Sequence, residues 1–441
     1  MKLKTHAKAA VTIACAATIA LALPATAKDL ERAATPESAG MSAEGLAKLK
    51  AAMAEMVTGG RRAGLTYAVA RHGKVVAVEA IGKRDLALNL PMEPDTAFRI
   101  YSMSRAPTAV TTLTLLDEGK LKLDDAVMKY IPEIGKSQVI KRIEGDKVVE
   151  TEPQRRPMTV YDVFTYTAGY GYAFDWPKGT GMTQSGILDI TKPISESMKL
   201  LASYPLLSQP GAKWHYGFSG DVLGRIAEVA SGKPLGPLMD ERLFKPLGMT
   251  NTGFWVSPAQ VERHDLATVY TLKDGKLVDM TDALGKLSTW TKPGPLFSGG
   301  GGLVSTAPDY LRFVQMLLQG GKLDGVQVLR PETAKGMLTR QTTAEQGDVY
   351  WYEADKYPTV KGYGWGLSIG VRPDNPSSDI PGKPGERYWG GAVNTVFFFN
   401  LDLDIAAVAM SQYQGPNASE INSTFRDGVY GAVMPEKVAK K

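Results

Sequence analysis

Residues 98–105 read Phe-Arg-Ile-Tyr-Ser-Met-Ser-Arg. The stretch ends a run of strand-forming residues and opens an amphipathic helix. The apolar residues of that helix recur at helical spacing: Met103, Ala106, Val110, Leu113 and Leu116. Ser102 is therefore predicted at a strand-to-helix junction, with Arg105 one turn further along the same helix face.

A serine at such a junction is typical of S-x-x-K acylases, in which a lysine three residues later can reach the serine hydroxyl. The hydroxyl is a weak nucleophile until a neighbouring base takes its proton. In this chain the fourth residue is Arg105. Arginine stays protonated in proteins, so it can orient groups or stabilise negative charge but cannot accept the Ser102 proton. The pattern predicts a nucleophile, Ser102, whose usual base is missing.

The first 27 residues are typical of a secretory signal peptide. Lys2, Lys4 and Lys8 precede an apolar run at 9–23, and a small-residue cleavage site follows at Ala25-Thr26-Ala27. The apolar run is too short for a comfortable membrane span, so we expect export to the periplasm or the medium without stable membrane insertion. Cleavage would remove the only cysteine, so no disulfide is expected.

Charge gives little indication of a macromolecular partner. The formal net charge is +5, and three of the lysines belong to the leader. Acidic and basic residues are mixed along the rest of the chain, apart from a short basic tail, which argues against nucleic acid and acidic membranes as partners. The oligomeric state is not readable from the sequence.

Strand patterns gather at the two ends of the chain. Residues 65–71 and 74–79 predict a β-hairpin across His72-Gly73, and 362–371, 395–401 and 404–411 predict further strands. Helices are predicted at 42–56, 159–166, 220–231, 308–318 and 419–433. The simplest assembly is one domain, 28–441, in which 28–118 and 340–441 form a common sheet and 119–339 is a mostly helical insert. The active cleft would lie where the two parts meet.

A second candidate segment is Trp214-His215-Tyr216-Gly217-Phe218, which precedes a predicted helix. A tyrosine beside a serine can act as a general base where cationic neighbours favour its ionised form. Taken alone, the segment favours the interpretation of Tyr216 as a packed loop aromatic. His215 is interpreted as a hydrogen-bonded loop histidine, with tuning of the site as the alternative.

A third segment, Tyr388-Trp389-Gly390-Gly391-Ala392, leads into a predicted strand. Glycines at a strand edge allow a close approach of backbone to ligand, so the N–H of Ala392 could pair with that of Ser102 as an oxyanion hole. A β-bulge is the alternative reading of Trp-Gly-Gly.

Together these segments resemble the serine β-lactamase and penicillin-binding-protein superfamily, in its class C-like branch, the family VIII carboxylesterases. Residues 102–105 are similar to the S-M-T-K of that branch, Tyr216 to its Y-x-N or Y-x-x tyrosine, and residues 389–391 to the W-G-G that replaces a K-T-G box. Residues 158–169, 246–252 and 300–311 also match family motifs in order. The resemblance implies an α+β fold (an α/β sandwich) of β-lactamase type, with an antiparallel sheet built from both chain ends.

Three departures qualify the resemblance. Arg105 replaces the lysine, Phe218 stands where β-lactamases carry asparagine, and Tyr166 with Ala168 replaces the usual His and Ser. Phe218 and Trp389 are ordinary for the esterase branch, which argues against penicillins as natural substrates. Arg105 is ordinary for neither branch.

Other site types are disfavoured. The chain holds no G-x-S-x-G, so an α/β-hydrolase nucleophile is missing. The histidines show no metal-binding spacing, and neither a metal nor a cofactor is expected. The glycine run 299–302 lacks the Lys-Ser/Thr of a phosphate loop and is interpreted as a flexible wall of the cleft.

Two hypotheses follow. In the first, the chain is a secreted serine hydrolase acting on small esters: Ser102 forms the acyl intermediate, Tyr216 moves the proton, and Arg105 stabilises Tyr216 as a phenolate. Trp389, Gly390, Gly391, Ala392 and Phe218 would contribute the oxyanion hole and substrate contacts. In the second, loss of the base has left a binding protein for a cell-wall peptide or another ligand. If loss of the lysine base has only weakened the enzyme, Arg105→Lys should raise kcat, and the match of the other segments to the family motifs favours this result. If the site has adapted to a guanidinium, the same change should lower kcat.

Overall fold

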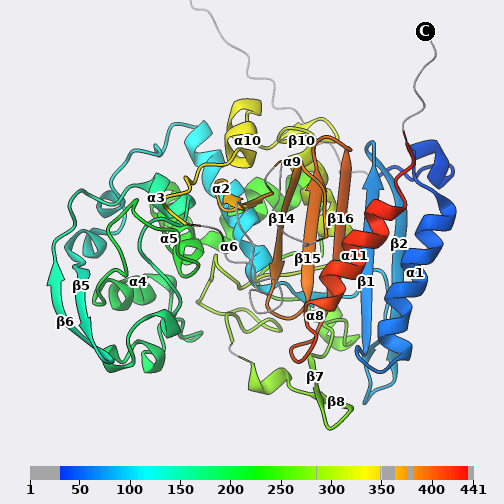
Figure 1. Cartoon of the computed structure of the whole chain (residues 1–441), viewed down its shortest axis with the longest axis horizontal. Coiled ribbons are helices and arrows are strands. Elements are labelled where there is room, and N and C mark those ends of the chain that lie inside the picture. Colours follow the sequence, from blue (N-terminus) through cyan, green and yellow to red (C-terminus); the bar gives the residue numbers. More distant parts are fainter. Residues whose placement is uncertain are drawn as a thin grey trace, which may run out of the picture.

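The computed structural model describes residues 30–435, except 285, 348, 350–362, 373 and 375–380. An eight-stranded antiparallel sheet dominates it, in the order β12-β13-β14-β15-β16-β1-β2-β3 (Figure 1). Strand β1 (Gly64–Arg71) pairs along its length with β16 (Ile405–Ser411), Leu65 lying opposite Ser411. The two ends of the chain therefore share one sheet, as predicted.

The remaining strands of the sheet are β2 (Lys74–Asp85), β3 (Leu90–Pro91), β12 (Gly364–Trp365), β13 (Gly370–Val371), β14 (Glu386–Gly391) and β15 (Thr395–Asn400). The helices are α1 (Ala43–Thr58), α2 (Arg105–Asp117), α3 (Val160–Phe164), α4 (Ile194–Ala202), α5 (Ser219–Ser231), α6 (Leu235–Met239), α7 (Lys245–Leu247), α8 (Pro258–Glu262), α9 (Ala307–Leu318), α10 (Pro331–Leu338) and α11 (Glu420–Gly431). Short two-stranded ribbons are β4 (Phe98–Arg99) with β9 (Val304–Ser305), β5 (Val139–Glu144) with β6 (Lys147–Glu152), β7 (Tyr270–Lys273) with β8 (Lys276–Asp279), and β10 (Lys322–Leu323) with β11 (Val326–Gln327).

The first hairpin forms where the sequence indicated it. His72 and Gly73 both have positive φ, 52° and 74°, the conformation of a tight turn whose twist matches its strands. All eight residues of β1 are buried, so this strand is covered on both faces. It lies in the interior of the sheet rather than at an edge.

Helices cover both faces of the sheet. Helices α1 and α11 pack together in front of it in Figure 1, and α9 lies behind it against β1, β15 and β16. Leu46, Leu49, Met53 and Met56 form the buried stripe of α1 at helical spacing. Helix α9 lies in the segment predicted as the insert, yet it packs on the sheet and completes its rear layer.

Helix α2 is the central helix of the region beside the sheet. Residues 105–115 are all buried, and the helix packs against α5 and α6. Three of its four buried threonines donate their hydroxyls within the helix: Thr108 to the Ser104 carbonyl (3.0 Å), Thr112 to the Thr108 carbonyl (2.8 Å) and Thr114 to the Thr111 carbonyl (2.7 Å). These local bonds make the threonines compatible with a buried helix.

Two local predictions were wrong. The segment predicted as one strand to residue 371 is a tight hairpin of β12 and β13, with Ser368 at φ 65° in the turn; residue 362 lies outside the described part. The glycine run 299–302 is buried against α2 and α5, since a Cβ on Gly299 would overlap the Gly220 carbonyl. These glycines allow close packing of backbone rather than forming a flexible wall.

A buried carboxylate joins two of the matching motifs. Asp309 accepts hydrogen bonds from the Asn251 N–H (2.7 Å) and the Thr252 hydroxyl (2.9 Å). Burial raises the pKa of Asp309 to about 6, against the lowering effect of these bonds. This cluster fixes the start of α9 against the preceding loop.

Within the described residues, none of the helices combines the length and apolarity that crossing a membrane requires.

Candidate active site

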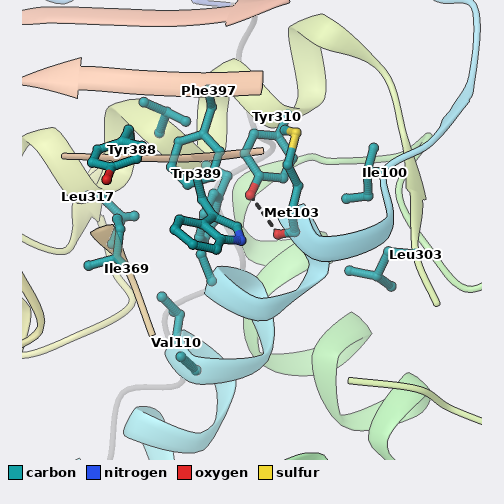
Figure 2. Close-up of a cluster of buried hydrophobic side chains, with 14 of the residues drawn as sticks. Ile100, Met103, Val110, Leu303, Tyr310, Leu317, Ile369, Tyr388, Trp389 and Phe397 are labelled. Carbon is teal, nitrogen blue, oxygen red and sulfur yellow. Dashed lines mark hydrogen bonds between the residues drawn. The ribbon is translucent and has the colours of Figure 1, made fainter. Parts of the chain in front are cut away.

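The predicted nucleophile lies in a clamped turn. Ser102 is 3% exposed and belongs to a 3-10 turn, η2 (Tyr101–Ser104), that runs directly into α2. The Ile100 N–H donates to the Leu303 carbonyl (3.0 Å), the Leu303 N–H to Ser104 Oγ (3.1 Å), and Tyr310 Oη to the Met103 carbonyl (2.8 Å; Figure 2).

Tyr101, immediately before the serine, has φ 40°. A bulky residue in the left-handed region carries backbone strain of about 1–3 kcal/mol, which persists only where the surroundings enforce it. Its ring packs on Trp290, with centroids 5.5 Å apart. The strain is located at the residue that orients the nucleophile.

Strand β14 reaches this turn. The Thr395 hydroxyl donates to the Ile100 carbonyl (3.4 Å), and a Cβ on Gly391 would overlap that same carbonyl oxygen. Only glycine permits this approach. The structure therefore brings the Gly390-Gly391 segment beside the Ser102 turn, and Ala392 follows as the first residue of the turn into β15.

Trp389 links β14 to the second predicted segment. Its indole Nε1–H donates to Tyr216 Oη at 3.0 Å, and the two ring centroids lie 5.1 Å apart. Figure 2 shows Trp389 between the sheet and the first turns of α2. Tyr216 is half-buried, whereas Trp389 is buried. A donated hydrogen bond stabilises negative charge on the phenol oxygen, which is what a general base requires.

Arg105 engages partners that its sequence context did not indicate. Nη1 donates to Tyr166 Oη (2.9 Å) and to the Gly217 carbonyl (2.8 Å), and Nη2 donates to Tyr172 Oη (2.6 Å). The guanidinium carbon lies 4.3 Å from the centroid of the Tyr216 ring. Arg105 thus meets Tyr216 through the ring face, as a cation–π contact.

The guanidinium is almost fully enclosed, with 1% of the residue exposed. Burial lowers the pKa of Arg105, but its interactions with Tyr166, Tyr172 and Tyr216 outweigh that effect and raise the pKa above its usual value. Among the described residues it forms no ion pair, and its Nε–H has no partner. A permanently charged group held by phenols can orient and stabilise but cannot take a proton.

Tyr166 occupies the place of the family's histidine and is itself strained, with φ 60°. Its ring lies 6.1 Å from that of Tyr216 and 4.8 Å from that of Trp365. Burial raises the pKa of Tyr166, against the lowering effect of Arg105, which favours its neutral form as a bond acceptor.

Tyr166 and Tyr172 are the residues whose contacts sequence reasoning missed. The available signals were the exchange of histidine for tyrosine at 166 and the Gly-Tyr-Gly-Tyr run at 169–172. Neither predicts a contact with Arg105.

Phe218 and His215 are the two remaining predicted residues of this region. Phe218 is buried and precedes α5, with its ring edge-to-face against Tyr172. His215 Nε2 and Ser208 Oγ share a hydrogen bond of 3.0 Å, and burial together with Lys213 lowers the pKa of His215 to about 4. His215 is therefore a neutral, hydrogen-bonded loop histidine.

No cluster of three or more metal-binding side chains occurs in the part of the chain that the structure describes.

Comparison with known proteins identifies the family of the chain. The Beta-lactamase family model matches residues 49–429. The chain belongs to the Beta-lactamase family. A Mycobacterium tuberculosis protein, Protein Rv1367c, is 34% identical over 82% of this chain and 89% of its own length. Esterase EstB of Burkholderia gladioli is 28% identical, over 87% and 95% respectively.

Solved structures of the family show the same fold. EstCE1, a hydrolase with promiscuous acyltransferase activity, superposes with a TM-score of 0.71 at 25% identity, covering 88% of this chain and 99% of its own. Simvastatin synthase from Aspergillus terreus gives a TM-score of 0.74 at 20% identity, over 88% and 98%. The superfamily and the α+β fold inferred from the motifs are thereby confirmed. Esterase and acyltransferase relatives support a serine-hydrolase, esterase-like function on small molecules.

Proposed function

We propose that the protein is a serine hydrolase that cleaves small carboxylic esters through an acyl-Ser102 intermediate. One observation carries the proposal: Tyr216 Oη accepts the Trp389 N–H at 3.0 Å, and the strand that carries Trp389 ends at Gly391, against the Ile100 carbonyl beside the Ser102 turn. The three segments that supply nucleophile, base and strand edge are thus joined by direct contacts. The esterase and hydrolase relatives support an ester as the substrate class.

In the proposed first step, Ser102 Oγ attacks the ester carbonyl carbon while its proton passes to Tyr216 Oη. The N–H groups of Ser102 and Ala392 would hold the oxyanion. Collapse of the tetrahedral intermediate expels the alkoxide, which takes the proton back from Tyr216. Water then attacks the acyl-serine by the same route, which releases the carboxylic acid and restores Ser102.

Arg105 is a positioning residue in this mechanism. Its charge, 4.3 Å from the Tyr216 ring, and the Trp389 N–H on the Tyr216 oxygen both favour negative charge on the phenol. Arg105 does not exchange protons with Ser102, so Tyr216 serves as the only base in both steps.

Two features favour esters over β-lactams. Phe218 is apolar where lactam-cleaving relatives carry an amide, and Trp389 offers neither the cation nor the hydroxyl of a K-T-G box. A lactam carboxylate would therefore meet no charge-assisted partner at these positions. The leader at 1–27, which lies outside the described residues, supports export to the periplasm or the medium as part of the proposal.

Labelling of Ser102 tests the proposal directly. The purified protein should react with a fluorophosphonate probe, with the adduct mapped to Ser102 by mass spectrometry, and should hydrolyse p-nitrophenyl acetate. Ser102→Ala should lose both signals and keep its melting temperature, whereas Ser203→Ala, at an exposed helix end, should lose neither. An unlabelled, inactive but folded wild-type protein would refute the hydrolase and favour the binding-protein hypothesis.

A further inference from the structure

Phe174 is exposed to an unusual degree. Its exposed fraction is 75%, the largest among the large apolar side chains of the described residues. Single exposed apolar residues are common and need no explanation by themselves. Phe174 differs because its ring packs against an aromatic side chain that in turn contacts Tyr216, the proposed base.

The continuity is given by ring contacts. The Phe174 ring lies 5.6 Å from that of Tyr172. The Tyr172 ring in turn meets Tyr216 edge-on at 5.4 Å and Phe218 edge-on at 5.7 Å. A chain of aromatic ring contacts therefore connects the exposed Phe174 with the half-buried Tyr216.

The segment that presents Phe174 is held in place. Tyr172 Oη accepts from Arg105 Nη2 at 2.6 Å, and the Tyr172 N–H donates to Asp175 Oδ2 at 2.6 Å. The Trp176 indole N–H donates to the Pro205 carbonyl at 2.7 Å. Residues on both sides of Phe174 are thus fixed, so its exposure is imposed by the surrounding structure.

We infer that Phe174, supported by Tyr172, is a specificity-determining residue that binds an apolar chain of the ester substrate. The inference rests on the proposed function and adds to it a substrate class, esters with a medium-length alkyl chain or an aromatic group. Such a chain would cover the Phe174 ring while the ester group lies at Ser102. Arg105, in this view, anchors the substrate-binding loop through the Tyr172 hydroxyl.

The experiment measures chain-length preference. The ratio of kcat/KM for p-nitrophenyl octanoate to that for p-nitrophenyl acetate tests a chain on the acyl side. The ratio for octyl acetate to ethyl acetate, followed in a pH-stat, tests a chain on the alcohol side. Phe174→Ala should lower one of these ratios about tenfold, because a few methylenes lose their apolar contact.

The controls separate this effect from general damage. Phe174→Leu should keep most of the preference, and Tyr172→Phe, which keeps the ring but loses the bond to Arg105, should lower the ratio less than Phe174→Ala. Leu88→Ala removes another exposed apolar side chain, 51% exposed on the turn before the edge strand β3, and should change neither ratio. Turnover of ethyl acetate should stay within about twofold in Phe174→Ala, since both groups of this ester are too short to cover the Phe174 ring.

Each outcome has a defined meaning. If wild-type protein hydrolyses esters but both ratios are the same in Phe174→Ala, the inference is overturned and the proposed function stands. If wild-type protein turns over no ester, the proposed function fails, and the inference fails with it.

Discussion

Replacing Arg105 by lysine tests whether the site has adapted to a guanidinium. The guanidinium donates to Tyr166, Tyr172 and Gly217 from two nitrogens at once. A single ammonium nitrogen cannot stand at both positions, so the variant loses at least one of these bonds. Hydrogen bonds of charged groups contribute about 1.5–3 kcal/mol each, so the free energy of unfolding should fall by about 2 kcal/mol.

For a chain of this length that loss lowers Tm by about 2–3 °C, given an unfolding entropy of about 2 cal/mol/K per residue. Activity should fall further. Release of Tyr172 and movement of the cation from the Tyr216 ring displace the base, and a displacement of about 1 Å can lower the rate by up to about 10²-fold. We expect kcat/KM on p-nitrophenyl acetate to drop at least about tenfold in Arg105→Lys. The contacts of Arg105 therefore predict a loss of activity in Arg105→Lys, whereas the family motifs in the sequence favoured a gain.

Arg71→Lys is the matched control. Arg71 is another buried arginine, and it donates to the carbonyls of Gly40 and Leu403 at the end of β1. Its replacement should lower Tm similarly and leave kcat/KM unchanged. Both variants are assayed from pH 6 to 10 with thermal unfolding in parallel. A rise of kcat/KM in Arg105→Lys, with lysine supplying the missing base, would refute the adapted-site reasoning.

Three further predictions use other parts of the site. Tyr216→Phe should lower kcat by about 10²-fold or more, because the phenol moves the proton, and Trp389→Phe should lower kcat less, because only the hydrogen bond to that phenol is lost. Equal kcat values in wild type and Tyr216→Phe would remove Tyr216 from the mechanism. The protein should hydrolyse p-nitrophenyl butyrate and leave nitrocefin nearly intact, and the reverse preference would contradict the ester assignment. His215 has a pKa of about 4 in the folded protein, so the unfolded chain binds a proton near pH 6.5 that the folded protein does not bind; the free energy of unfolding should therefore fall by up to about 3 kcal/mol between pH 6.5 and pH 4. Denaturation with guanidinium chloride at several pH values should show a smaller fall in His215→Gln, and the same pH dependence in both proteins would disprove this role of His215.

Local patterns were sufficient to predict part of the molecule. The hairpin of β1 and β2, the helix after Ser102 and the strand β15 each follow from a period or a turn within a short window, so they could be read from the sequence. Strand β14, which carries Trp389, was not predicted as a strand. The short hairpin at β12 and β13 could not. It depends on Ser368 in a left-handed conformation and on strands of two residues each, which leave no alternation to detect.

The partners of Arg105 were beyond sequence reasoning for a different reason. Tyr166 follows a one-turn helix and Tyr172 lies in an irregular loop, and both meet Arg105 only because α2 packs into the same region. The spacing of these residues along the chain does not indicate such a contact. The structure places the Arg105 guanidinium at the face of the Tyr216 ring, and the predicted stabilisation of a Tyr216 phenolate by Arg105 stays a prediction.

The pairing of β1 with β16 has a consequence for biosynthesis. A ribosome makes β1 long before β16, and until β16 emerges the long hydrogen-bonding edge of β1 that faces it lacks its native partner. The strand that sets Gly391 against the Ser102 turn, β14, is joined to β1 only through β15 and β16. A nascent chain without β16 therefore lacks the link that holds β14, and with it Gly391, in one sheet with β1, so its serine centre is incomplete.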